Sequence, residues 1–273
     1  MTVLADLHTH STASDGQYTP TELVHLAKDQ GLEVLAITDH DTVDGLDEAV
    51  LAGERLKLRV IRGIEFAAKE YHTFHILGYG FDPNDYTLAV LCGDLKAGRD
   101  QRAPRIISYL KEQGVEVSLA EVEELAGGNI VGRPHFAQAL IRRGYVSDSR
   151  EAFGRYLDTE EFHQQVERPK PAARVCVEAI KKAGGWVSLA HPNQIRVDNE
   201  TLESIIQELA SYGLDAIECF YPQYTPEQQA FYFHLAEKYG LYLTGGSDFH
   251  GELIKPNICM STLALNLDWL IEN

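Results

Sequence analysis

Short apolar and β-branched runs recur along the chain, and the segments between many of them have the spacing of amphipathic helices. The runs cover residues 3–7, 34–38, 60–64, 74–79, 186–190, 216–220 and 241–244. Strands that alternate with helices are typical of parallel βα units. The pattern therefore predicts an α/β fold, built either as a barrel or as a doubly wound sheet.

Two of the intervening segments carry the same helix start signal. Thr19-Pro20-Thr21-Glu22 is a capping box with proline at the first helical position, and Thr225-Pro226-Glu227-Gln228 repeats it. Gly31 and Gly240 stand where such helices would end, because glycine readily ends a helix. These signals predict a helix before Gly31 and another before Gly240.

One stretch interrupts the alternation of strands and helices. Between residues 99 and 168 we find helical patterns and no convincing strand. Ser118-Leu119-Ala120-Glu121 is a further capping box, and residues 134–144 and 149–157 have helical spacing. We therefore expect a small α-helical insertion domain at 99–168, between the two segments of the main domain at 1–98 and 169–273.

Histidines and carboxylates lie in or just after most of the predicted strands. These nine residues are His8, His10, Asp15, His40, Glu65, His75, His191, Asp248 and His250. The C-terminal strand ends of a parallel barrel meet on one face, so the nine side chains should converge there. Imidazoles and carboxylates together suit borderline or hard divalent ions such as manganese, iron or zinc. The sequence therefore predicts a polynuclear metal site.

Other polar residues near these positions allow simpler interpretations. His25, His163 and His234 lie on predicted helices, where a histidine is more often a surface or core residue than a ligand. His72 lies in a loop close to His75 and within reach of the same site. Asp39 and Asp41 flank His40, and either an orienting contact to a ligand or a solvated, capping role fits them.

The charge balance restricts the class of partner. The 273 residues include 41 acidic and 24 basic residues, for a formal net charge of −17. Such a chain should repel long duplex nucleic acid, whereas a small phosphorylated nucleotide or the end of a short RNA remains allowed. The sequence has no apolar run long enough to span a membrane and no basic signal-like start. We expect a cytoplasmic monomer without a membrane partner.

The motifs, taken together, resemble those of the polymerase and histidinol phosphatase (PHP) superfamily over nearly the whole chain. They are His8-Thr9-His10, Asp15-Gly16, Thr38-Asp39-His40-Asp41, Gly63-Ile64-Glu65, His75, His191-Pro192 and Ser247-Asp248-Phe249-His250. The resemblance implies a distorted (β/α)7, TIM-like barrel that holds two or three divalent metal ions. The helical insertion would be an addition to this barrel.

The resemblance also implies how the ligands are shared in a trinuclear site. The three ion positions would use His8, His10, Glu65 and Asp248; then Glu65, His75 and His191; then Asp15, His40 and His250. Histidinol-phosphatase members more often have histidine at the place of Asp15. Aspartate is the harder ligand, so manganese is favoured over zinc, with iron as a further alternative.

Three phrases resemble a narrower bacterial branch of the superfamily. They are Ser14-Asp15-Gly16, Thr38-Asp39-His40-Asp41-Thr42 and Gly132-Arg133-Pro134-His135-Phe136. Members of that branch remove phosphate from nucleoside 3′,5′-bisphosphates and trim short oligoribonucleotides. This chain departs from the branch at Asn193-Gln194, where relatives commonly have Gly-Arg, and at Ala67, where they often have serine. These departures put the substrate contacts in doubt and remove no predicted ligand.

The first hypothesis is therefore an enzyme that hydrolyses the 3′-phosphate of nucleoside 3′,5′-bisphosphates by metal-activated water, and that also trims short oligoribonucleotides from the 5′ end. Histidinol phosphatase, or another small-molecule phosphomonoesterase, is the alternative within the same chemistry. A non-catalytic, metal-binding accessory domain is the alternative from another class. The predicted catalytic residues are Asp15, His40, Glu65 and His250.

The predicted insertion supplies basic residues for a second phosphate. Arg99, Arg102, Arg133 and His135 are the candidate substrate-binding residues. An arginine fork can bind a phosphate through two hydrogen bonds. A solvated helix face explains Arg99 and Arg102 equally well, whereas Arg133 beside Pro134 at a helix start is the stronger candidate.

The resemblance assigns Glu65 to two ions at once, which makes this residue the most sensitive position. We predict that Glu65→Ala abolishes phosphate release by the manganese-loaded protein, because a bridging carboxylate holds both ions in place. A colorimetric phosphate assay with excess substrate measures the effect. Activity close to that of the wild type would contradict the bridging role.

Overall fold

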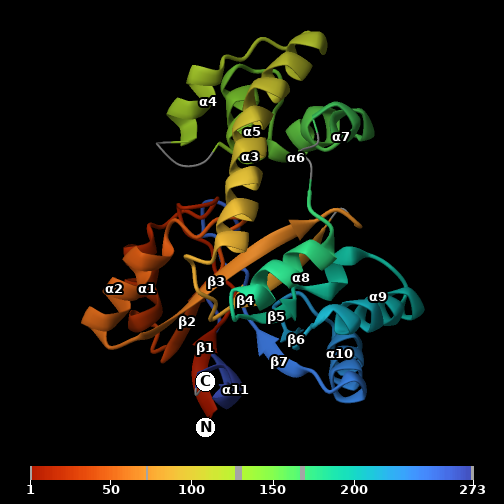
Figure 1. The fold of residues 1–273 in the computed structure, drawn as a ribbon. Coiled ribbons are helices and arrows are strands. Elements are labelled where there is room, and N and C mark those ends of the chain that lie inside the picture. Colours follow the sequence, from red (N-terminus) through yellow and green to blue (C-terminus); the bar gives the residue numbers. More distant parts are fainter. Residues whose placement is uncertain (1, 72, 127–130, 167–169, 272–273) are drawn as a thin grey trace. The chain divides into compact units, whose positions relative to one another are not determined.

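The computed structural model describes residues 2–71, 73–126, 131–166 and 170–271 (Figure 1). The chain divides into two compact units, one made of residues 1–92 and 170–273 and the other of residues 93–169. The first boundary falls inside the long helix α3 (Tyr86–Glu112), six residues before the predicted position 99. An uninterrupted helix offers no turn signal that would mark a boundary in the sequence. The predicted end at Arg168 lies outside the described residues.

The first unit is built on one eight-stranded sheet that nearly closes into a barrel. Its strands are β1 (Thr2–Asp6), β2 (Val34–Ile37), β3 (Arg59–Ala68), β4 (Phe74–Tyr79), β5 (Trp186–Leu189), β6 (Ala216–Phe220), β7 (Tyr242–Gly245) and β8 (Leu263–Asn266). Their order in the sheet is β7-β6-β5-β4-β3-β2-β1-β8. The seven predicted strands and the predicted barrel are therefore confirmed, and β8 is a strand that the sequence pattern did not indicate.

The strand directions correct the expectation of parallel units throughout. β1, β2 and β3 are parallel to one another, as are β5, β6 and β7. β4, however, runs antiparallel to both β3 and β5, and β8 runs antiparallel to β1. Only residues 69–73 join β3 to β4, and a connection this short can only turn the chain back, since a parallel crossover needs about a dozen residues.

The backbone after β1 pairs with the backbone after β7 and so closes the barrel at one end. The Leu7 amide donates to the Gly245 carbonyl at 3.1 Å, and the His10 amide donates to the Phe249 carbonyl at 2.9 Å. Between them the Asp248 amide donates to the His8 carbonyl at 2.8 Å. These hydrogen bonds close the barrel where the predicted ligands after β1 and β7 lie.

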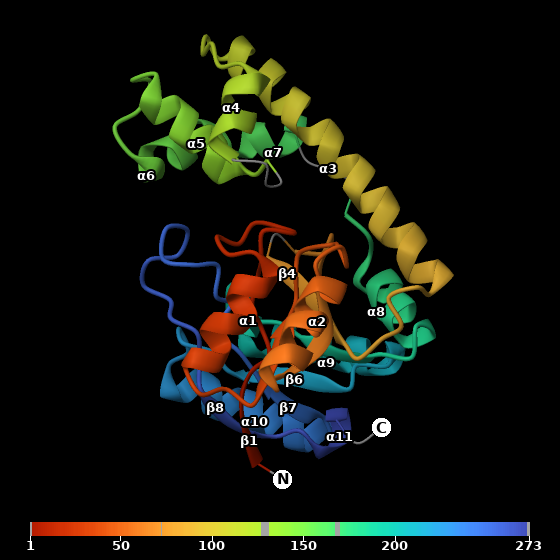
Figure 2. The ribbon, with the colours of Figure 1, turned by 90° about the vertical axis from the view of Figure 1, so that its left-hand side faces the viewer.

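Helices cover the outside of the barrel, and their ends follow the sequence signals. They are α1 (Pro20–Asp29), α2 (Leu46–Leu56), α8 (Ala173–Lys182), the 3-10 turn η2 (Pro192–Ile195), α9 (Asn199–Tyr212), α10 (Pro226–Tyr239) and α11 (Asp268–Ile271). Figure 2 shows α1 and α2 side by side against the sheet. The capping boxes predicted at Thr19 and Thr225 are present. Gly31 and Gly240 follow these helices with positive φ.

All the described elements of the second unit are helices joined by loops and turns, which confirms the predicted α-helical insertion. After α3 come α4 (Leu119–Ala126), α5 (Arg133–Arg142), α6 (Ser149–Ala152), the π-helical turn η1 (Phe153–Leu157) and α7 (Glu160–Val166). Its own core contains the fully buried Phe136, Leu140 and Phe162. Over the described parts of both units, no helix has the length and apolar character that a bilayer crossing requires.

The capping box of α10 gives a test of the local structure. Thr225 Oγ1 accepts from the Gln228 amide at 3.2 Å, and Gln228 Oε1 accepts from the Thr225 amide at 3.0 Å. We predict that Thr225→Ala lowers the free energy of unfolding by about 1 kcal/mol, because two backbone donors lose their acceptors or their geometry. Urea unfolding followed by circular dichroism measures the loss. Thr225→Ser keeps the hydroxyl and should stay close to the wild type, and equal stabilities of all three proteins would contradict the prediction.

Candidate metal centre

All nine predicted ligands belong to the first unit, and the barrel brings them to one end. His8 and His10 follow β1, His40 follows β2, and His191 follows β5. Asp248 and His250 come after β7 and complete the set of residues that follow parallel strands. The polar positions after the predicted strands therefore converge as expected.

Glu65 and His75 reach the same end by a different route. The sequence pattern suggested that Glu65 follows its strand. β3 in fact continues to Ala68, so Glu65 lies within the strand. It still faces the centre, because residue 40 after β2 forms an isolated parallel bridge with residue 65. His75 is the second residue of β4, and the antiparallel direction of β4 places its start beside the ends of the parallel strands.

The first group of possible ligands is His8, His10, Glu65 and Asp248. One ligand atom from each lies within 4.8 Å of the others, and all four residues are buried. His8 Nε2 lies 3.3 Å from Glu65 Oε1, and His10 Nε2 lies 3.3 Å from Asp248 Oδ1. This grouping is the same as the first one implied by the family resemblance.

The second group shares the carboxylate of Glu65 with the first. His40, Glu65 and His75 have ligand atoms within 4.8 Å of one another. His75 Nδ1 and His191 Nε2 each lie 2.9 Å from Glu65 Oε1, while His40 Nδ1 lies 3.0 Å from Glu65 Oε2. Glu65 is therefore adjacent to both groups, as a bridging ligand would be.

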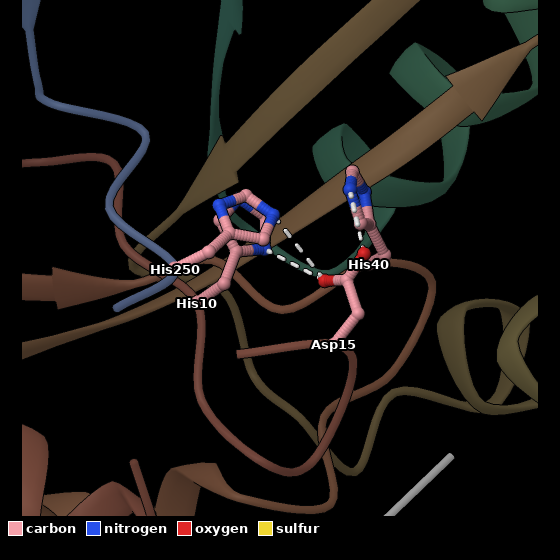
Figure 3. A group of neighbouring side chains, drawn as sticks. All are labelled: His10, Asp15, His40 and His250. Carbon is pink, nitrogen blue, oxygen red and sulfur yellow. Dashed lines mark ion pairs between the residues drawn. The ribbon is translucent and has the colours of Figure 1, made fainter. Parts of the chain in front are cut away.

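The third group contains Asp15, His40, His250 and also His10 (Figure 3). His250 Nε2 lies 3.4 Å from Asp15 Oδ1, and His40 Nε2 lies 4.0 Å from Asp15 Oδ2. The Asp15 side chain is 38% exposed, whereas that of His10 is fully buried. The centre is thus open to solvent on the side of Asp15.

Several buried donor atoms in these groups form no hydrogen bond, and this observation tests whether metal ions fit. Over the described chain, the atoms include His8 Nε2, both ring nitrogens of His10, and Glu65 Oε2. A buried polar atom without a partner costs about 1–3 kcal/mol, so several together are unfavourable unless another group binds them. Cations bound among these nitrogens and oxygens would satisfy them, and the donor set suits divalent ions. The cluster is a site for divalent metal.

The buried side chains of the site have shifted pKa values, and two carboxylates and one histidine are held in the forms that bind cations. Burial alone would raise the pKa of Glu65, but His40, His75 and His8 hold it well below its usual range. Burial would likewise raise the pKa of Asp248, but Lys255 and neighbouring histidines hold it well below its usual range. Burial lowers the pKa of His75 to about 4, against the opposing effect of Glu65. At neutral pH the two carboxylates are ionised and His75 is neutral.

Two buried aspartates fix the loops that carry the candidate ligands. Asp39 accepts hydrogen bonds from the Ser11 amide at 2.7 Å, from Ser11 Oγ at 2.6 Å and from Ser14 Oγ at 2.5 Å, so it anchors the loop that leads to Asp15. Asp6 does the same for the loop before Asp248, because it accepts from the Ser247 amide and hydroxyl. Of the two roles open to Asp39, the orienting one is supported.

Asp41 has a different role from Asp39. It adopts a positive φ of 56°, and its carboxylate accepts from the Ala67 amide at 3.3 Å. The Asp41 amide donates to the Glu65 carbonyl at 3.0 Å. These contacts hold the backbone after β2 against β3, on either side of Glu65. The Ala67 departure therefore leaves the backbone contact at this position intact.

Sequence analysis missed three residues that contact candidate ligands. Lys255 Nζ lies 2.7 Å from Asp248 Oδ2, and the Tyr221 hydroxyl donates to the same oxygen at 3.2 Å. Glu218 contacts His8 and His191. A charged residue inside the apolar run of β6 was a signal for Glu218, whereas Lys255 and Tyr221 lie in loops without a recognisable pattern. Gln194, one of the departures, donates to the Tyr221 hydroxyl at 2.8 Å.

The four predicted substrate-binding residues lie in the second unit. Arg133 Nη1 donates to Asp158 Oδ1 at 2.7 Å, and His135 Nδ1 accepts from the Gly132 amide at 3.0 Å. The Arg102 guanidinium lies over the Phe162 ring, 5.8 Å from its centroid. The phosphate-binding role of these residues and of Arg99 stays a prediction. His72 lies outside the described residues.

Gly246 provides a test of the close backbone pairing beneath the centre. A Cβ atom at this position would overlap His8 Cβ and lie 2.5 Å from the His8 backbone nitrogen. We predict that Gly246→Ala lowers the free energy of unfolding by about 1–3 kcal/mol and weakens metal binding, because His8 must move. Thermal unfolding with and without manganese measures both effects.

The matched control for this substitution is Gly93→Ala in α3. No atom of the described residues lies within 4 Å of a Cβ at Gly93, and alanine favours a helix over glycine by about 1 kcal/mol. This variant should bind manganese as the wild type does and should not be less stable. If Gly246→Ala behaves in the same way, the close approach of residues 246 and 8 is wrong.

Comparison with known proteins supports the same chemistry. The family model of the PHP domain matches residues 6–166. A 5′-3′ exoribonuclease of Haemophilus influenzae is 36% identical, over 92% of this chain and 91% of its own length. A phosphoribosyl 1,2-cyclic phosphate 1,2-diphosphodiesterase of Eggerthella lenta is 35% identical, over 92% of this chain and 95% of its own length. A 3′,5′-nucleoside bisphosphate phosphatase of Chromobacterium violaceum is 32% identical, over 90% and 86%.

A solved structure agrees in fold as well. It is a protein of Bifidobacterium adolescentis assigned as a metal-dependent phosphoesterase. The two structures superpose with a TM-score of 0.83 at 30% identity, over 98% of this chain and 94% of that protein. The barrel, the converging ligand groups and these relatives lead to one conclusion: the chain belongs to the PHP domain family and is a metal-dependent phosphoesterase.

Proposed function

We propose that this phosphoesterase removes the 3′-phosphate from nucleoside 3′,5′-bisphosphates and trims short oligoribonucleotides from the 5′ end. The observation that carries the proposal is the placement of Glu65, whose two carboxylate oxygens face all three groups of donor atoms. The names of the Haemophilus and Chromobacterium relatives support the two substrate classes. The net charge of −17 supports a small substrate over a long polyanion.

The proposal includes nine ligands and three manganese ions. His8, His10 and Asp248 would complete one position with Glu65, and His75 and His191 another. Asp15, His40 and His250 would hold the third. Bound divalent ions would polarise the phosphoryl oxygens and make a water molecule nucleophilic at neutral pH. The Asp15 carboxylate, a harder ligand than histidine, supports manganese, with iron and zinc as alternatives.

Proton transfer to the leaving oxygen is assigned to the side of the centre that opens to solvent. Asp15 and His40 are the partly exposed residues of the third group, and His250 lies beside them. The ring of His250 donates through Nδ1 to the Asp248 carbonyl at 2.9 Å, so its Nε2 faces Asp15. Water that reaches this open side can deliver the proton to the leaving oxygen. We also propose that a second phosphate binds to Arg99, Arg102, Arg133 and His135. The guanidinium groups of the three arginines can each bind a phosphate through two hydrogen bonds.

A second candidate substrate comes from the relative of Eggerthella lenta. That protein is named for action on a phosphoribosyl cyclic phosphate, and its match to this chain is as extensive as the others. Histidinol phosphate remains a comparison substrate, although Asp15 and the helical insertion disfavour it. The alternative of a non-catalytic accessory domain loses support, because the relatives that match about nine-tenths of the chain are named as enzymes.

A substrate panel tests the proposal. Manganese-loaded protein should release phosphate from adenosine 3′,5′-bisphosphate faster than from adenosine 3′-monophosphate or histidinol phosphate, since a second phosphate adds binding contacts. A chelator should remove the activity, and added manganese should restore it more fully than added zinc. Phosphate-release assays at equal substrate concentration measure the ranking.

Two results would overturn parts of the proposal. If the bisphosphate is inert while other monoesters are hydrolysed well, the substrate class is wrong and the phosphoesterase assignment stands. If the cyclic phosphodiester of phosphoribose is cleaved much faster than every nucleotide, the second candidate replaces the first. Arg133→Ala should raise the KM for the bisphosphate if the predicted phosphate contact exists.

A further inference from the structure

The central strand β6 carries a charged side chain that belongs to none of the three ligand groups. Glu218 lies in the middle of Ala216–Phe220, and its exposed fraction is 0%. Burying a carboxylate without partners is costly, so its surroundings must satisfy both oxygens. Both oxygens are in fact directed at candidate metal ligands.

Glu218 connects two strand ends that are not neighbours in the sheet. Its Oε1 lies 3.1 Å from Nδ1 of His8, which follows β1. Its Oε2 accepts a hydrogen bond from the backbone amide of His191, which follows β5, at 2.7 Å. β5 adjoins β6, whereas β1 is separated from it by four strands in the sheet order. At this end of the barrel, where the backbone after β1 pairs with the backbone of β7, the contact to His8 spans β7.

The contact to His8 decides which ring nitrogen can bind a metal ion. An ionised carboxylate accepts hydrogen bonds only, so Nδ1 must carry the proton in this contact. Nε2 is then the ring nitrogen left to bind a metal ion, and it lies 3.3 Å from Glu65 Oε1 and 3.6 Å from Asp248 Oδ1. His8 Nε2 is also one of the buried donor atoms without a hydrogen bond among the described residues.

The contact to His191 holds an unusual backbone conformation. His191 has φ 24° and ψ 62°, in the region of positive φ that residues other than glycine rarely adopt. Such a conformation persists only when its surroundings fix it. The hydrogen bond from the His191 amide to Glu218 is one such restraint. It keeps His191 Nε2 at 2.9 Å from Glu65 Oε1, on the second ligand group.

We propose that Glu218 is a positioning residue that holds ligands of two different metal positions at once. It sets the tautomer of His8 and the backbone of His191, so both positions depend on one carboxylate. The inference rests on the proposed metal ligation. Contacts of this kind from a carboxylate to a ligating histidine are typically worth about 10–100-fold in metal affinity. Glu218 itself belongs to none of the three groups of possible ligands.

The substitution Glu218→Gln tests whether Glu218 acts through its two hydrogen-bond acceptors or only by occupying space in the barrel interior. Glutamine has the same size, but its amide offers one acceptor and one donor group in place of two acceptors. Either His8 Nδ1 or the His191 amide therefore faces a donor. We expect the Kd for manganese, measured by titration calorimetry on chelator-treated protein, to rise about 10–100-fold. In nitrogen-15 spectra of the metal-free protein, the His8 Nδ1 signature should differ from that of the wild type, because its carboxylate partner is gone.

Thr244→Val is the matched control. Thr244 is equally buried on β7, directly beside Glu218 in the sheet register, and its hydroxyl contacts Ser188 Oγ at 2.8 Å. This variant removes a polar contact from the barrel interior without touching a candidate ligand. Its Kd for manganese should stay within about twofold of the wild type. Circular dichroism of each variant checks that the barrel is folded.

The outcomes separate this inference from the proposed ligand set. If the wild type binds no manganese, the ligand set fails, and with it the proposal. If the wild type binds and Glu218→Gln binds equally well with an unchanged His8 signature, only the role of Glu218 is overturned. Should Glu218→Gln not fold, Glu218→Asp decides, because its shorter side chain cannot keep both contacts. A folded Glu218→Asp with the wild-type Kd overturns the role, and a Kd raised about 10-fold or more supports it.

Discussion

The structure depends on the burial of one carboxylate, Glu65, among the rings of five histidines. A buried charge is unfavourable unless opposite charges and hydrogen bonds offset the loss of water. The oxygens of Glu65 face His8, His75 and His191 on one side and His10 and His40 on the other, at 2.9–3.3 Å. Bound cations would offset the energetic cost of burying this charge, and they would also draw the strand ends together. In this way one constraint accounts for the convergence of the strands and for the chemistry.

The convergence of the candidate ligands could be predicted because the sequence signals for it are local. A polar residue just after an apolar run identifies His8 and Asp248 without knowledge of the fold. It does not predict that β4 runs antiparallel, since that depends on the short connection 69–73 and not on the strand itself. It places Glu65 after a strand where the structure places it inside β3. Strand direction and strand length arise from pairing, which is a property of the whole barrel.

The contacts that the sequence could not reveal are mostly those that hold the loops. Asp6, Asp39 and Glu218 are buried carboxylates that do not belong to the ligand groups, and each anchors backbone or side chains next to a candidate ligand. Their partners are far away in the chain, as with Asp6 and Ser247, so no spacing rule could connect them. A set of outer carboxylates that fixes inner ligands is a general property of metal centres. Here the contact of Asp6 with Ser247 also joins β1 to the loop after β7 and so helps to close the barrel.

The central claim is that metal ions bind around Glu65 at the end of the barrel. Anomalous diffraction from crystals of the manganese-loaded protein tests it most directly, because manganese positions are located without reference to activity. We predict one strong peak beside Glu65 between His8, His10 and Asp248, a second on the side of His75 and His191, and a third near Asp15, His40 and His250. Manganese bound elsewhere in the protein, with no peak within coordination distance of Glu65, would contradict the account.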